Sequence, residues 1–201
     1  MHRRPLALLA VLLSGLLVAA VLASGALAAN VKIRVEGRTQ TIYGPTQPQI
    51  QADNVLQALD VASVAGEFHY ALTTSSFGDY VSQIGKYAAA GSEGWAFKVN
   101  GVSPPVGADK VVLKEGDVVL WYYAAFGTTG GPPTLELQRL PANCYVVQSV
   151  TDAGKRTRAA GATLTVDGKR FRAPQGRACI GRHTGLVRAV AAGSIRSNAV
   201  K

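Results

Sequence analysis

The sequence predicts an α+β fold, in which a β-grasp-like domain with a sheet over one helix precedes a small all-β sandwich domain. Three observations predict it. Short segments that alternate apolar and polar residues recur along the 201-residue chain, as half-buried strands do. Only one segment, after Asp53, has its apolar residues at helical spacing. A Gly/Pro-rich run near residue 130 separates two halves of opposite charge, and this length suits two small domains.

Residues 1–28 have the features of a secretory signal peptide. Arg3 and Arg4 precede an apolar run over residues 6–22, and small residues follow it up to Ala28. We expect cleavage after Ala28 and a mature protein that is secreted or held at the cell surface. The alternative is an uncleaved anchor, since an apolar helix of about 20 residues can span a bilayer.

The first domain is expected over residues 29–126. Residues 31–36 alternate like a strand, and residues 39–43 can return beside them as a hairpin partner. A helix is expected after Asp53, its predicted N-cap, with Gly66 as its end. Further strands are expected in the following ranges: 68–72, 95–99, 111–113 and 117–124. Two strands, one helix and several more strands are the order of a β-grasp-like domain.

Two motifs in this domain carry a family resemblance. Residues 94–101 read Gly-Trp-Ala-Phe-Lys-Val-Asn-Gly, and residues 116–123 read Gly-Asp-Val-Val-Leu-Trp-Tyr-Tyr. With residues 54–59 and 78–84, they resemble a bacterial family of domains of unknown function that is similar to the C-terminal domain of transcobalamin and intrinsic factor. The resemblance implies a β-grasp fold and a role in ligand binding or surface display. In the vertebrate carriers this domain closes over cobalamin beside a helical domain, and no such helical domain is predicted here. We therefore expect no cofactor, and a corrinoid is the alternative that the resemblance implies.

The last predicted strand of this domain is apolar on both faces. Trp121 and Tyr123 lie on one face and Tyr122 on the other, because side chains alternate along a strand. One face must cover the helix. The other face is either a platform for a flat ligand or a packing surface for the next domain. Tyr80, Trp121 and Tyr123 are the candidate ligand-binding residues.

The sequence offers little for catalysis. It contains no Gly-x-Ser-x-Gly elbow, no phosphate-binding loop and no His-Glu-x-x-His helix, and it has only three His and two Cys. We therefore expect a protein that is not an enzyme and that holds no metal ion. A small molecule remains the expected partner of the first domain.

Residues 127–139 are expected to form a linker, after which the chain becomes strongly basic. Residues 30–133 hold seven Lys or Arg against nine Asp or Glu, whereas residues 134–201 hold twelve against three. Such a surface favours an anionic envelope polymer or a lipid surface as partner. A basic surface with no partner is the alternative. Nucleic acid is not expected, because Tyr145 and Phe171 are the only aromatic residues there for stacking.

The second domain is expected over residues 140–201 as a β-sandwich. Its predicted strands cover the following ranges: 144–150, 161–168, 177–180 and 186–190. Residues 161–168 and 186–190 are similar to the carboxypeptidase-regulatory or transthyretin-like repeats of surface proteins. Outside the cytoplasm, Cys144 and Cys179 are expected to form a disulfide. The alternative, a metal pair of Cys179 and His183, lacks two further ligands.

These observations predict an exported, non-enzymatic ligand-binding or cell-surface protein, with a corrinoid or another small molecule as its ligand. The alternative is a structural or adhesive envelope protein without a small-molecule ligand.

Overall fold

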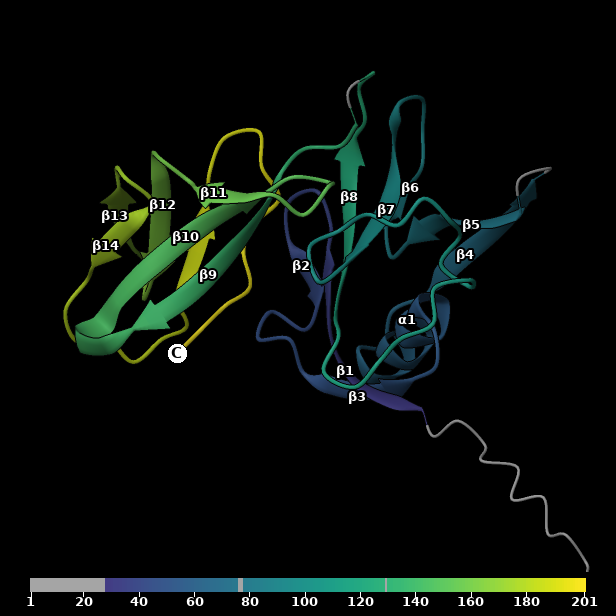
Figure 1. The fold of residues 1–201 in the computed structure, drawn as a ribbon, viewed down its shortest axis with the longest axis horizontal. Coiled ribbons are helices and arrows are strands. Elements are labelled where there is room, and N and C mark those ends of the chain that lie inside the picture. The colour runs from purple at the N-terminus through teal and green to yellow at the C-terminus, as the bar shows by residue number, and fades with distance from the viewer. Residues whose placement is uncertain (1–27, 76–77, 129) are drawn as a thin grey trace, which may run out of the picture.

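The computed structural model describes residues 28–75, 78–128 and 130–201, so nearly all of the predicted signal peptide lies outside the described residues. The described chain forms two halves that lie side by side in Figure 1: an N-terminal half, residues 28–126, and a C-terminal half, residues 130–201. Each half has its own hydrophobic core. Within the described part, no helix is long and apolar enough to cross a membrane.

The N-terminal half is built around two neighbouring parallel strands. β1 (Ala29–Glu36) and β8 (Val118–Ala125) pair in parallel, with Val35 opposite Trp121. β7 (Glu93–Val99) is antiparallel to β8 along its length. On the other side of β1, two short antiparallel strands complete the sheet, β2 (Thr41–Tyr43) and β3 (Gln49–Ala52).

Helix α1 (Val55–Ala65) covers one face of this sheet, and the buried positions of the helix lie at helical spacing, as predicted. The predicted N-cap, Asp53, was wrong by one residue. The Asn54 side chain accepts a hydrogen bond of 2.9 Å from the backbone N–H of Gln57. The backbone N–H of Gly66 closes the other end on the carbonyl of Ala62.

A second, three-stranded sheet follows the helix. It contains β4 (Tyr70–Ser75), β5 (Gly78–Ile84) and β6 (Tyr87–Ala88), and β5 pairs with both of the others. The predicted strand at residues 68–72 therefore begins two residues late and runs further. Asn100 and Gly101 form a tight turn, but β8 begins only at Val118, so this turn does not join β7 directly to β8.

The C-terminal half is all β, and its strands form two sheets. One sheet contains β9 (Thr134–Leu140), β10 (Cys144–Val150), β11 (Arg156–Arg158) and β14 (Arg177–Cys179), with a short 3-10 turn η1 (Pro141–Asn143) between β9 and β10. The other contains β12 (Ala162–Val166), β13 (Lys169–Ala173) and β15 (Arg188–Val190). The core between them is apolar, with Leu135, Tyr145, Val147 and Leu164 at its centre.

Two predictions about this half can be compared with the structure. Cys144 and Cys179 occupy paired positions on β10 and β14 and form the predicted disulfide. The predicted linker, residues 127–139, is shorter in the structure. β9 begins at Thr134, and each of its residues pairs with β10.

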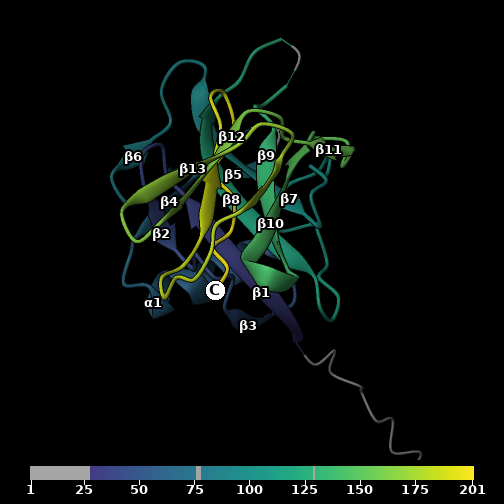
Figure 2. The same ribbon diagram turned by 90° about the vertical axis from the view of Figure 1, so that its left-hand side faces the viewer.

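The two halves pack through the sheet face that α1 leaves open. Leu120 and Tyr122 of β8 lie on that face and are buried with Ile195 of the C-terminal half. Figure 2 shows the C-terminal half in front of this sheet. The second face of the last strand is therefore a packing surface for the next unit, which is one of the two expected alternatives.

Candidate functional site

The interface between the halves contains a buried cluster of one acid and three arginines. Glu36 is only 1% exposed and accepts hydrogen bonds from Arg34 on its own strand and from Arg188 and Arg196 of the C-terminal half. Its contact distances to these guanidinium nitrogens are 3.0, 2.5 and 2.8 Å, respectively. One carboxylate faces three guanidinium groups, so the cluster as a whole is positively charged.

A second charged contact lies further along the same face. Lys98 of β7 is fully buried, and its Nζ lies 3.1 Å from Asp152 Oδ1 and donates to the carbonyl of Val150 at 3.0 Å. Burial lowers the pKa of Lys98, while Asp152 opposes this shift. The sheet thus holds two cations, Arg34 and Lys98, beneath the C-terminal half.

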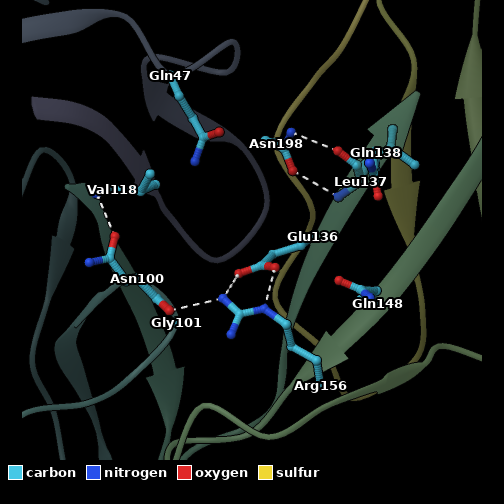
Figure 3. Close-up of a pocket in the computed structure, with 10 residues that line it drawn as sticks. All are labelled: Gln47, Asn100, Gly101, Val118, Glu136, Leu137, Gln138, Gln148, Arg156 and Asn198. Carbon is cyan, nitrogen blue, oxygen red and sulfur yellow. Dashed lines mark hydrogen bonds and ion pairs between the residues drawn. The ribbon is translucent and has the colours of Figure 1, made fainter. Parts of the chain in front are cut away.

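A polar cleft opens between the halves beside these cations, with a volume of about 350 Å³. Figure 3 shows the residues that line it: Gln47, Asn100, Gly101, Val118, Glu136, Leu137, Gln138, Gln148, Arg156 and Asn198. Glu136 and Arg156 form a two-point ion pair across it, with both contacts at 2.9 Å. Arg156 also donates to the backbone carbonyl of Asn100, which ties this side of the cleft to the N-terminal half.

The amide side chains of the polar cleft fall into two groups. Asn198 bonds to the backbone of Leu137 through both of its amide atoms, and Asn100 accepts from the backbone N–H of Val118, so these two hold the walls together. The side-chain amides of Gln47, Gln138 and Gln148 have no hydrogen-bond partner among the described residues, and in Figure 3 no dashed line reaches them. Each offers donors and an acceptor to a ligand.

A smaller inner hollow adjoins the cleft and reaches the buried cations. It has a volume of about 30 Å³, shares Gln47, Gly101, Val118 and Glu136 with the cleft, and is also lined by Arg34 and Lys98. Arg34 lines this hollow, and its Nε is buried without a hydrogen-bond partner among the described residues. Burial lowers the pKa of Arg34 to about 10, against the attraction of Glu36, so its guanidinium stays charged at neutral pH.

An aromatic pocket lies on the opposite side of the sheet, within the N-terminal half. Its volume is about 90 Å³, and its lining includes Tyr80, Trp95, Phe97, Ala108 and Trp121. The rings of Phe97 and Trp121 pack against each other at a tilt of 43°, with centroids 5.2 Å apart. Tyr80 is 51% exposed and stands at the rim, whereas Trp121 is 2% exposed.

The two tryptophans of this pocket differ in hydrogen bonding. Trp95 donates its indole N–H to the carbonyl of Tyr87 at 2.8 Å. The indole Nε1 of Trp121 is buried with no acceptor among the described residues. A buried donor that lacks a partner costs about 1–3 kcal/mol, so an acceptor delivered by a ligand would be stabilised there.

The structure brings two of the three candidate ligand-binding residues together. Tyr80 and Trp121 both line the aromatic pocket. Tyr123 does not line it. Its ring packs against Tyr87 and Trp95, and its hydroxyl donates to the carbonyl of Ala88 at 2.8 Å. Trp95 is an additional pocket residue, which was not among the candidates.

Sequence reasoning missed the polar cleft. Part of the signal was present, because Leu135 and Leu137 alternate with Glu136 and Gln138 in β9, which places both polar side chains on the face away from the core. That stretch was assigned to the linker. Gln47 lies in the loop between β2 and β3, and no local pattern relates it to β9.

Comparison with known proteins gives a partial family match. Residues 51–125 match the family described as a domain of unknown function, DUF4430, and this range contains the whole aromatic pocket. No curated protein matches the chain. Among solved structures, the chain is similar to a candidate metal binding protein from Ruminococcus gnavus ATCC 29149. Identity is 11% and the TM-score is 0.38, over 49% of this chain and 99% of the other. Among the described residues, no group of three or more His, Cys, Asp or Glu side chains is placed to hold a metal ion.

Proposed function

We propose that this chain is an exported, non-enzymatic binding protein whose N-terminal half, a β-grasp-like domain, takes a small and mostly apolar ligand with one hydrogen-bond acceptor. The observation that carries the proposal is the aromatic pocket, in which Trp121 lies buried with an unpartnered indole N–H. Ligand pockets combine apolar walls with a few fixed polar groups, and this pocket has that composition. Export is supported by the signal-like residues 1–28 and by the disulfide.

The acids near this pocket are engaged in contacts of their own. Asp79 accepts a hydrogen bond from Thr74 at 2.7 Å, and Asp109 pairs with Lys110 at 2.7 Å. Lys110 holds the pKa of Asp109 below its ordinary value. A general acid at neutral pH needs the opposite shift.

The volume of the pocket limits the ligand. About 90 Å³ is the space of roughly three water molecules, so the group that fits is the end of a longer molecule, or one edge of a ring whose remainder lies over the open rim. A corrinoid could place only a side group inside, while its macrocycle lay over Tyr80 and Leu72, which is also exposed at the rim.

Nuclear magnetic resonance of the two indole N–H groups tests the proposal directly. We expect cyclohexanone to shift the Trp121 resonance saturably, and methylcyclohexane, which has no acceptor, to shift it less. The Trp95 N–H, already bonded to Tyr87, is the internal control and should move little. Ala108→Leu, which fills the pocket, should abolish the response. If cyclohexanone shifts neither indole resonance, or if it shifts the Trp121 resonance as strongly in Ala108→Leu as in the parent protein, the proposal is wrong.

Titration with aquocobalamin under the same conditions tests the corrinoid version. A saturable shift that Tyr80→Ala weakens would support a corrinoid that covers the rim. No shift would remove corrinoids as ligands of this pocket and leave the smaller ligand class to the first experiment.

A second candidate function, attachment to an anionic lipid surface of the envelope, is favoured by the exposed basic residues of the C-terminal half. Lys169, Arg170 and Arg172 of β13 and Arg177 of β14 are all exposed, and none has an acidic partner among the described residues. Sedimentation with phosphatidylglycerol vesicles, compared with phosphatidylcholine vesicles, tests it. We expect the protein to sediment only with the anionic vesicles, and we expect moderate salt to reverse this binding. Equal sedimentation with both would contradict it.

A further inference from the structure

The polar cleft between the halves has the chemistry of a second binding site, separate from the aromatic pocket. It lies on the opposite face of the sheet, and its walls come from both halves. At about 350 Å³ it falls within the range of small-molecule sites, which occur preferentially between domains. Nothing in the proposed function of the aromatic pocket depends on it.

The walls of the cleft select for hydroxyl groups. Gln47, Gln138 and Gln148 present three side-chain amides that have no protein partner among the described residues. Figure 3 shows Gln47, from the N-terminal half, on one side of the polar cleft and Gln138 and Gln148 on the other. Amides both donate and accept, as vicinal hydroxyls do, so their spacing around one space suits a ligand with several hydroxyl groups.

The inner hollow selects for an acid. Arg34 lines the inner hollow and is only 2% exposed. Its Nε–H is buried without an acceptor among the described residues. A volume of about 30 Å³ has room for one oxygen atom. Hydrogen bonds from a guanidinium to a carboxylate are among the strongest in proteins, so a carboxylate oxygen is the acceptor that gains most there.

The charges around the inner hollow agree with this assignment. Glu136 is neutralised by Arg156, and Asp152 is paired with Lys98. Arg34, Arg188 and Arg196 share the single carboxylate of Glu36. Glu136 and Asp152 are therefore paired, and the three arginines around Glu36 leave a positive charge.

We propose that the polar cleft binds a sugar acid of the uronate class. Its hydroxyls would contact the free amides of Gln47, Gln138 and Gln148, and one oxygen of its carboxylate would enter the inner hollow against Arg34. Such a group occurs both as a free monosaccharide and within acidic polysaccharides. The cleft is open to solvent, so either source can reach it.

Calorimetric titration of the protein containing both halves tests the proposal with a matched pair of sugars. D-Glucuronate and D-glucose share the ring and differ in the carboxylate. We expect glucuronate to bind at least about tenfold more tightly, since one buried charge-assisted hydrogen bond separates them. Equal binding of the two sugars, or no binding of either, would overturn the proposal. A comparison of trigalacturonate with D-galacturonate distinguishes the sources, because a site for a polymer should bind the trimer more tightly than its own monomer.

Variants locate the binding. Gln148→Leu should weaken glucuronate binding about threefold to tenfold, by removing one amide that faces the ligand. Gln49→Ala, an exposed glutamine on β3 outside the cleft, is the control and should change nothing. Arg34→Lys keeps the charge but removes the Nε–H, and should reduce the preference for glucuronate over glucose. If Arg34→Lys does not fold, Gln148→Leu still decides, because unchanged binding in that variant would place the sugar elsewhere.

Discussion

Glu36 and Arg188 form a buried ion pair that joins the two halves of the chain. Arg188 Nη2 lies 2.5 Å from Glu36 Oε1, although the two residues are 152 positions apart. Arg196 reaches the other carboxylate oxygen at 2.8 Å. The basic C-terminal half therefore places two of its arginines on one acid of the N-terminal half.

Glu36→Gln tests how much this cluster contributes to the free energy of unfolding. The substitution leaves three buried or half-buried guanidiniums without a counter-charge, and breaking a buried pair in this way costs about 3–5 kcal/mol. We expect a corresponding loss in the free energy of unfolding by urea, followed by tryptophan fluorescence. Glu93→Gln is the control, since Glu93 pairs with Arg38 at an exposed position and should change stability little. Similar losses in both variants would contradict the buried role of Glu36.

The sequence predicted most strands but not how they meet. Alternation identified β1, β7 and β12, because a half-buried strand carries its pattern within a few residues, whereas β8 was predicted from a run that is apolar on both faces. The sequence predicted mostly strands with one helix, and the described residues, which contain one α-helix, confirm this. The ends of elements were less accurate. Asp53 and Asn54 are both good N-caps, and no local signal separates them.

The sites were less predictable than the strands. Strand alternation places Trp121 and Tyr123 on one face, but two residues along a strand span about 7 Å. Tyr123 therefore packs against Tyr87 outside the pocket. Trp121 and Tyr80 line the pocket. The Glu36 cluster depends on partners more than 150 positions away. Such pairings follow from the docking of the halves, which no local pattern encodes.

Asn54→Ala tests the observed start of helix α1. Its side chain caps the N–H of Gln57, and losing such a cap costs about 1 kcal/mol. Asp53→Ala is the matched control, because only the backbone N–H of Asp53 bonds to the Gln57 side chain. We expect it to cost less than about 0.5 kcal/mol. Thermal unfolding of both variants measures the difference. A larger loss of stability in Asp53→Ala than in Asn54→Ala would show that Asp53 is the N-cap, as the sequence predicted.

The Cys144–Cys179 disulfide is expected to stabilise the C-terminal half. It links residues 35 positions apart, and closing such a loop contributes about 3–4 kcal/mol in the chain-entropy model. Replacing both cysteines with alanine should lower the melting temperature of this half, and adding a reductant to the parent protein should have the same effect. The double variant is its own control, since the reductant should not change it further. A parent protein that melts identically with and without reductant would contradict this expectation.

Tyr122 is expected to make the protein sensitive to alkaline pH. Burial, with a further contribution from the charge of Asp152, raises the pKa of Tyr122 from 10.0 to about 12. A group whose pKa is raised on folding contributes stability that is complete below its unfolded pKa and is lost as the pH rises through the folded value. Stability should therefore fall between pH 10 and pH 12, by up to about 2 kcal/mol for this group.

Lys98, whose Nζ lies 5.8 Å from the centre of the Tyr122 ring, acts in the opposite direction. Its pKa is lowered by burial, so its contribution to stability rises with pH up to its unfolded value of 10.5. Comparing the parent with Tyr122→Phe separates the two, because Lys98 is present in both proteins. Urea unfolding at pH 9 and at pH 11.5 should show a smaller alkaline loss in Tyr122→Phe than in the parent, while Tyr80→Phe, at an exposed position, should behave like the parent. Equal losses of stability in all three proteins would assign the alkaline transition to other groups. They would also mean that burial between the halves does not keep Tyr122 in its neutral form.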